Sequence, residues 1–227
     1  MPRQAFDQEL QRLQDEVLVL GSMVEEALVR SVETLKRKDF DASRRLIAAD
    51  QDINNRRYAI EADVLALIAM QQPMAGDMRL LAAILEIAGE LERMGDYAKG
   101  IARINLMIGE EPFIKPLIDL PVMAAKARDM LHQALQAFVL RDVDLARAIP
   151  RRDDEVDALY DQIYRELVTY ILQDPRVTDQ ANHLMWAAHN LERAADRVTN
   201  LCERVIFMVT GDLVELVSDD SGIESVS

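Results

Sequence analysis

Apolar residues recur every three or four positions along nearly the whole chain, which is the period of an amphipathic α-helix. Three such stretches occupy the first half, at about residues 4–37, 39–71 and 76–108. Asp39 or Asp41 is placed to cap the second stretch, and Pro73 marks the turn that follows it. The first half therefore predicts three long helices joined by short turns.

The sequence GEEPFIKPLIDLP, residues 109–121, contains one glycine and three prolines and interrupts the pattern. Such a composition is typical of a linker. The helical pattern then starts again, with one helix over about 122–141, a second ending near residue 172 and a third ending near residue 210. The polar tail SDDSGIESVS is predicted to be disordered.

The two halves match each other. Lys38-Asp39 aligns with Arg141-Asp142, Gln72-Pro73 with Asp174-Pro175, and LERMGD with LERAAD, at offsets of 103, 102 and 100 residues. Long helices with short connections pack antiparallel. The prediction is an all-α fold of six long helices, built as two tandem repeats of an antiparallel three-helix bundle. The two predicted domains are residues 1–110 and 111–227, the second including the short tail.

Composition narrows the function. A net charge of −14 disfavours nucleic acid as a partner, because phosphate binding requires a surface rich in Lys and Arg. Cys202 is the single cysteine, so no internal disulfide is possible, and we expect a buried thiol in a cytoplasmic protein. No apolar run reaches the ~20 residues of a membrane span. Any membrane contact is therefore expected to be peripheral and made through partners.

Candidate chemistry lies in paired acids. Residues i and i+4 of a helix share one face, and each half carries such pairs on its second and third helices. The third-helix pairs are Glu92 with Asp96 and Glu192 with Asp196; the second-helix pairs are Asp153 with Asp157 and, in the first half, Asp50 with Asn54. Where these helices pack together, the oxygen atoms would converge. Carboxylates suit Mg²⁺, Mn²⁺, Fe or Zn²⁺, and a bridged cluster can hold more than one ion.

A simpler interpretation stays open at this point. A chain with 40 acids forms several such pairs by chance, and Arg93 and Arg193 are near enough in sequence to neutralise them. The motifs of phosphate-binding loops, dinucleotide-binding folds and zinc proteases are absent, as is a nucleophile with its base, so the case for an enzyme is weak. His132, His183 and His189 lack a mutual ligand spacing and are interpreted as surface or packing residues.

The segments LERMGDYAKGIARI (91–104) and LERAADRVTNLCERVIFMVTGDLVEL (191–216) resemble the paired signatures of the PhoU family of phosphate-signalling regulators. The resemblance extends over nearly the whole chain. It implies two similar three-helix bundles with multinuclear iron or zinc clusters on acid-x-x-x-Asp motifs. It also implies a negative regulator of phosphate uptake and of the phosphate-starvation response, often a homodimer, which links the phosphate ABC transporter to a membrane sensor histidine kinase.

Carried onto this chain, the second half matches the motif pair fully, with Asn200 and Glu203 following on the same helical face. The first half departs from it. Asn54 replaces the second acid of its motif, and Gly100 stands where the second half has Asn200. We therefore expect a weaker or smaller metal site in the first bundle.

Two other functions remain as alternatives. One is a carboxylate-bridged metalloenzyme or metal-storage bundle, which would need an open coordination position and a redox-active metal. The other is a helical adaptor whose acidic faces are only solvated.

Overall fold

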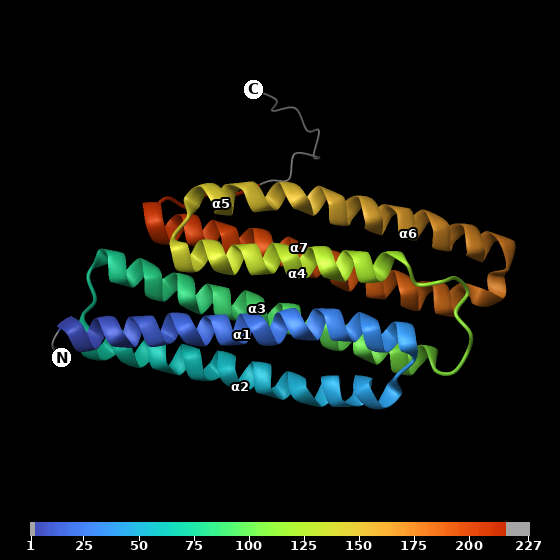
Figure 1. Ribbon diagram of the computed structural model, residues 1–227, viewed down its shortest axis with the longest axis horizontal. Helices are drawn as coiled ribbons and strands as arrows, with labels where there is room; N and C mark the ends of the chain where they lie inside the picture. Colours follow the sequence, from blue (N-terminus) through green and yellow to red (C-terminus); the bar gives the residue numbers. More distant parts are fainter. Residues whose placement is uncertain (1–2, 217–227) are drawn as a thin grey trace, which may run out of the picture.

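The computed structural model describes residues 3–216, and this part of the chain is helical with no β-strand (Figure 1). The predicted all-α fold is confirmed. The elements are α1 (Arg3–Arg37), α2 (Phe40–Gln71), α3 (Ala75–Ile108), α4 (Asp119–Leu140), the short α5 (Val143–Ala148), the 3-10 turn η1 (Ile149–Arg152), α6 (Asp153–Gln173), η2 (Pro175–Val177) and α7 (Thr178–Thr210). The predicted tail beyond residue 216 lies outside the described residues.

Helices α1 to α3 form one bundle and α4 to α7 form the other (Figure 1). In α1 the apolar positions Leu13, Val17, Leu20, Val24 and Leu28 follow three- and four-residue steps, and each is almost completely buried. The buried side chains of both bundles belong to one continuous core. This shared core holds the two halves of the molecule together through hydrophobic burial.

The bundles meet mainly where α3 packs antiparallel against α7. Glu90 of α3 accepts a hydrogen bond from Asn200 of α7 at 3.2 Å. Further along the pair, a Cβ atom on Gly100 would lie 2.8 Å from Nδ2 of Asn190, so glycine permits the close approach there. Residue 90 thus lies opposite residue 200, and residue 100 lies opposite residue 190. Residues 95 and 195 therefore lie opposite each other, midway between these two contacts.

The turn that opens the second helix has the same construction in both bundles. Lys38 and Arg141 adopt left-handed φ angles of 55° and 54°. Asp39 and Asp142 follow them and cap the next helix, each accepting a hydrogen bond from the backbone N–H three residues later, at 2.8 and 2.9 Å. The predicted cap at Asp39 is confirmed, and the aligned turns are copies in structure as well as in sequence.

The prediction for the fifth helix was wrong in one respect. We expected it to be continuous, but the structure breaks it into α5, η1 and α6 at Pro150, because proline has no N–H to donate and its ring clashes with the preceding turn. The break makes Asp153 the first residue of α6. Helix α4 also begins three residues earlier than expected, since Pro121 is tolerated in a first helical turn.

The connection between the bundles, residues 109–118, is anchored to its surroundings. Lys38 donates a hydrogen bond to a linker carbonyl at 3.0 Å, and Gln180 of α7 both accepts from and donates to the linker backbone, at 2.6 and 3.0 Å. Lys115 is itself buried and contacts Glu166 of α6. The linker is therefore fixed to elements of both bundles.

Two further expectations can be compared with the fold. Cys202 is completely buried in the core, as predicted, and burial raises the pKa of its thiol to about 12. Among the described residues, no helix is long and apolar enough to cross a membrane.

Candidate metal centre

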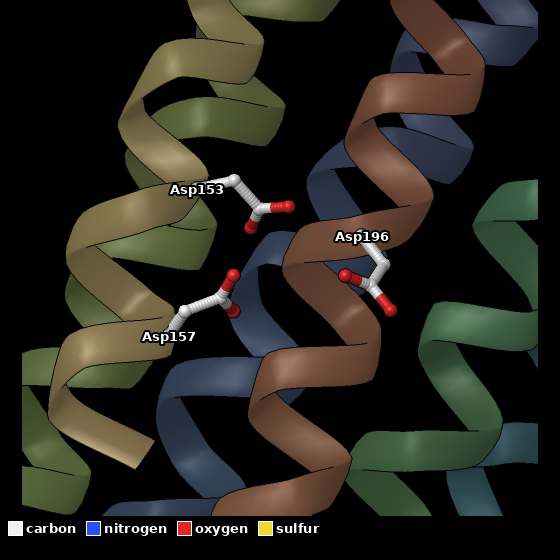
Figure 2. A group of neighbouring side chains, drawn as sticks. All are labelled: Asp153, Asp157 and Asp196. Atoms are coloured by element: carbon white, nitrogen blue, oxygen red, sulfur yellow. The ribbon is translucent and has the colours of Figure 1, made fainter. Parts of the chain in front are cut away.

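Three aspartates converge between α6 and α7 in the second bundle (Figure 2). Asp153 and Asp157 stand one turn apart on α6 and point toward α7, where Asp196 faces them. One carboxylate oxygen from each lies within 4.8 Å of the others. Three negative groups so close repel one another unless a proton or a cation is present.

Glu192 lies one turn before Asp196 on α7 and belongs to the same electrostatic cluster. Burial, first, and the charges of Asp157, Asp196 and Glu192 together raise the pKa of Asp153 to about 7. Burial together with the charges of Asp196 and Asp157 likewise raises the pKa of Glu192 to about 7. Near pH 7, Asp153 and Glu192 are therefore partly protonated, and a cation that binds there would take the place of these protons.

Two oxygen atoms of this cluster lack hydrogen-bond partners. Oδ1 of Asp153 and Oε2 of Glu192 are buried and receive no hydrogen bond. Nδ1 of His189 lies 3.1 Å from the same Glu192 oxygen, but the contact does not have hydrogen-bond geometry. Arg193 pairs with Asp196 at 3.0 Å. Because unpartnered buried carboxylate oxygens are costly, the residues fit a bound cation that would accept them as ligands.

Sequence reasoning missed two neighbours of the cluster. His189 was interpreted as a surface or packing residue, and its side chain, about half exposed, borders Glu192. The ring of Tyr160 from α6 lies 6.0 Å from the His189 ring. The spacing of His189 and Glu192 is i, i+3, which places them on one helical face and would have indicated this contact.

The first bundle treats the matching acids differently. Asp50 is buried on α2 and accepts a hydrogen bond from Nζ of Lys99 at 2.6 Å and another from Asn54 at 3.2 Å. The same ammonium group lies 3.2 Å from Asp96. Burial raises the pKa of Glu92, and the charge of Asp96 adds to it.

The seven predicted metal ligands thus divide into two groups. The structure brings Asp153, Asp157 and Asp196 together with Glu192 beside them, and it joins Asp50 and Asp96 through the side chain of Lys99. The negative charges of Asp96 and Asp50 both act on Glu92 and raise its pKa. Among the described residues, the second-bundle trio alone has three acidic ligand atoms within 4.8 Å.

The two side chains predicted to follow the motif on α7 make other contacts. Asn200 is directed to Glu90 of α3, and Glu203 accepts a hydrogen bond from the backbone of Leu216 at 2.9 Å. Lys99 was missed altogether, although its i, i+3 spacing from Asp96 is visible in the sequence.

The PhoU domain family matches this chain twice, over residues 17–104 and 120–205. The chain belongs to the PhoU family. It is 35% identical over 207 residues to the phosphate-specific transport system accessory protein PhoU homolog of Aquifex aeolicus, covering 91% of this chain and 94% of that protein. With the phosphate-specific transport system accessory protein PhoU of Escherichia coli it shares 34% identity, over 95% of this chain and 89% of the relative.

Solved structures of PhoU proteins share the fold. The phosphate transport system regulatory protein PhoU from Streptococcus pneumoniae superimposes with a TM-score of 0.86 at 31% identity, over 93% of this chain and all of that one. PhoU from Pseudomonas aeruginosa gives the same TM-score and identity over 91% of this chain. The resemblance inferred from the paired motifs is therefore confirmed, and each half of the chain carries one PhoU domain.

Proposed function

We propose that this protein is a metal-binding negative regulator of phosphate uptake and of the phosphate-starvation response. The observation that supports the transport role is the similarity of nearly the whole chain to proteins described as accessory or regulatory components of phosphate transport. In this role the protein contacts the phosphate ABC transporter and a membrane sensor histidine kinase, and it is cytoplasmic and dimeric. The proposed action is regulation of partners and not catalysis.

The metal site proposed for this regulator is the acidic cluster of the second bundle. Asp153 and Asp157 of α6 would hold the ion together with Asp196 and Glu192 of α7, so that the metal joins the two helices. A divalent cation would neutralise the carboxylates and accept the unpartnered oxygen of Asp153. The oxygen-rich set suits Mg²⁺, Mn²⁺ or iron, and the neighbouring His189 nitrogen would favour Zn²⁺ or iron.

Metal analysis of protein purified without chelator tests the site directly. We expect bound metal in the wild type, and its loss in a variant that carries Asp153→Ala with Glu192→Ala. Asp154→Asn is the matched control, because Asp154 adjoins Asp153 but is exposed. Unchanged metal content in the double variant would show that these residues do not form the site.

Gene deletion tests the regulatory role separately. Loss of the gene should raise expression of phosphate-starvation genes in phosphate-rich medium, and re-expression of the wild-type protein should repress them again. Complementation by the Asp153→Ala, Glu192→Ala variant then decides whether metal is needed for repression. Unchanged expression after deletion would contradict the regulatory function for this protein.

Partner binding and the enzymatic alternative have their own measurements. Co-purification with the transporter ATPase subunit and with the kinase is expected, and light scattering should give twice the monomer mass.

The observation that supports the metalloenzyme or storage alternative is the cluster itself, since bridging carboxylates also support redox chemistry. Oxygen- or peroxide-dependent turnover by the iron-loaded protein would favour that alternative.

A further inference from the structure

The side chain of Lys99 lies inside the acidic cluster of the first bundle. We propose that this ammonium group is the resident cation of that cluster, so that the first bundle holds no metal and the protein binds metal in its second bundle alone. The second clause of this proposal rests on the proposed metal site, whereas the role of Lys99 in neutralising Asp50 stands on the contacts of the first bundle.

The geometry of Lys99 is that of an internal counter-ion. Nζ lies 2.6 Å from Oδ2 of Asp50 on α2 and 3.2 Å from Oδ1 of Asp96 on its own helix, α3. The side chain of Asp50 is 6% exposed and that of Lys99 is 20% exposed, so water does little to screen the pair. A single positive group therefore bridges α2 and α3 where a metal ion would otherwise bridge them.

The aligned positions of the second bundle lack this positive group. Thr199 occupies the position of Lys99, Asp157 that of Asn54, and Tyr160 that of Arg57. Each of these replacements makes the second cluster more negative than the first. The charges that act on Asp153 come from four other acids, whereas in the first bundle the positive charge of Arg57 acts on Glu92.

Asn54 provides a second donor to the buried acid of the first cluster. Its amide donates to the same Asp50 oxygen that Lys99 approaches, at 3.2 Å, so this oxygen already has two donors. A metal ion would have to displace the ammonium group and this amide hydrogen bond to reach the carboxylate. By contrast, Oδ1 of Asp153 is buried without any donor. The first cluster is therefore neutralised by a side chain of the protein itself, Lys99, and the second cluster by a cation bound from solution.

The test transfers the residues of the second cluster into the first. The background carries Asp153→Asn with Asp157→Asn, which disables the second cluster, and Mn²⁺ binding is measured by equilibrium dialysis. We expect no bound Mn²⁺ in this background. Adding Asn54→Asp with Lys99→Thr should create a site that binds Mn²⁺ at least ~10-fold more tightly than a control that keeps Lys99. The control replaces the exposed Lys36 instead, as Asn54→Asp with Lys36→Thr.

Two results would overturn the proposal. One is Mn²⁺ binding by the background protein that is lost when Asp50 is changed to Asn, which would show that the first cluster accepts metal despite Lys99. The other is a Lys99→Thr graft that is folded by circular dichroism but binds no more Mn²⁺ than the Lys36→Thr control.

A measurement without metal separates this proposal from the proposed function. In the presence of chelator, Lys99→Met should lower the melting temperature by about 5 °C, since it leaves Asp50 buried without its cation. Lys36→Met should change it little. Equal melting temperatures for the two variants would contradict the counter-ion role. If wild-type protein bound no metal at all, the proposed metal function would fail while this difference would still report on Lys99.

Discussion

The two bundles are built alike but neutralise their buried acids in different ways. Both open their second helix with a left-handed residue and an aspartate cap, and both place an acid of that helix against the third. In the first bundle Nζ of Lys99 lies 2.6 Å from Asp50, whereas in the second bundle the charges that act on Asp153 are all negative. A repeated fold therefore does not require a repeated site, because a few side chains decide which half is left with excess negative charge.

The helix that carries the acid also differs between the bundles. Asp50 lies inside the continuous helix α2. Asp153 is instead the first residue of α6, because Pro150 interrupts the α-helix just before it. The N-terminal turn of a helix favours negative charge. Pro150 thus places the most perturbed acid of the second cluster where its ionised form receives some support.

The largest expected difference between the bundles is their response to metal. Saturation at 100 times Kd contributes about 2.7 kcal/mol, which should raise the melting temperature of the chelator-treated wild type by roughly 5–10 °C. Asp157→Asn should abolish this shift. Asn54→Ala, at the aligned position of the first bundle, should leave it in place. A shift reduced equally by both variants would make the two clusters equivalent, contrary to our interpretation.

The pH dependence of stability gives the next largest effect. The pKa values of Asp153 and Glu192 are raised to about 7 in the folded protein, so between pH 4 and pH 7 the folded state binds more protons than the unfolded state. The free energy of unfolding of metal-free protein should therefore fall as pH rises through this range, by an amount on the order of 2 kcal/mol.

Urea denaturation at pH 5 and pH 8 checks this slope. Asp153→Asn should flatten it, since the amide cannot ionise, and the exposed neighbour variant Asp154→Asn should keep it. Stability that rises with pH in metal-free wild type would contradict the assignment.

A smaller effect is expected at two aligned positions in the contact between α3 and α7, Glu90 and Asn190. Glu90 is paired with Arg197 at 3.3 Å and with Asn200 at 3.2 Å, so Glu90→Gln should cost about 1–2 kcal/mol. Asn190→Ala, which changes the aligned position near Gly100, should cost less than about 0.5 kcal/mol. Thermal denaturation of the two variants at one pH measures the difference, and equal losses would show that the two aligned positions contribute alike.

The smallest effect concerns the glycine that distinguishes LERMGD from LERAAD. A Cβ on Gly95 would lie 3.1 Å from the buried side chain of Ile53, whereas a Cβ on Gly89 would meet open space. Gly89→Ala should therefore stabilise α3 by about 0.5–1 kcal/mol through helix propensity. Gly95→Ala should gain less or lose stability, although Ala195 is native at the aligned position. Comparing their denaturation midpoints decides whether the first bundle is packed more closely here.

Helical periodicity and turn residues were sufficient to predict the fold and its internal repeat. The break at Pro150 was missed because Ala146, Ile149 and Val156 continue the buried pattern across it, so periodicity alone did not reveal the lost hydrogen bond. The acids of the candidate site could be found from i, i+4 spacing. The spacing of Lys99 from Asp96 was visible in the same way, but its contact with Asp50 was not, because the long side chain crosses to another helix and only tertiary structure shows which acid it reaches.

The antiparallel contact of α3 with α7 has a consequence for symmetry. Glu90 meets Asn200, and their repeat equivalents, Asn190 and Gly100, meet each other, as in the isologous interface of a two-fold dimer. In a true homodimer, any substitution appears in both subunits. Here both halves belong to one chain, so Lys99 and Thr199 can differ, and a pseudo-symmetric scaffold can keep two chemically distinct centres.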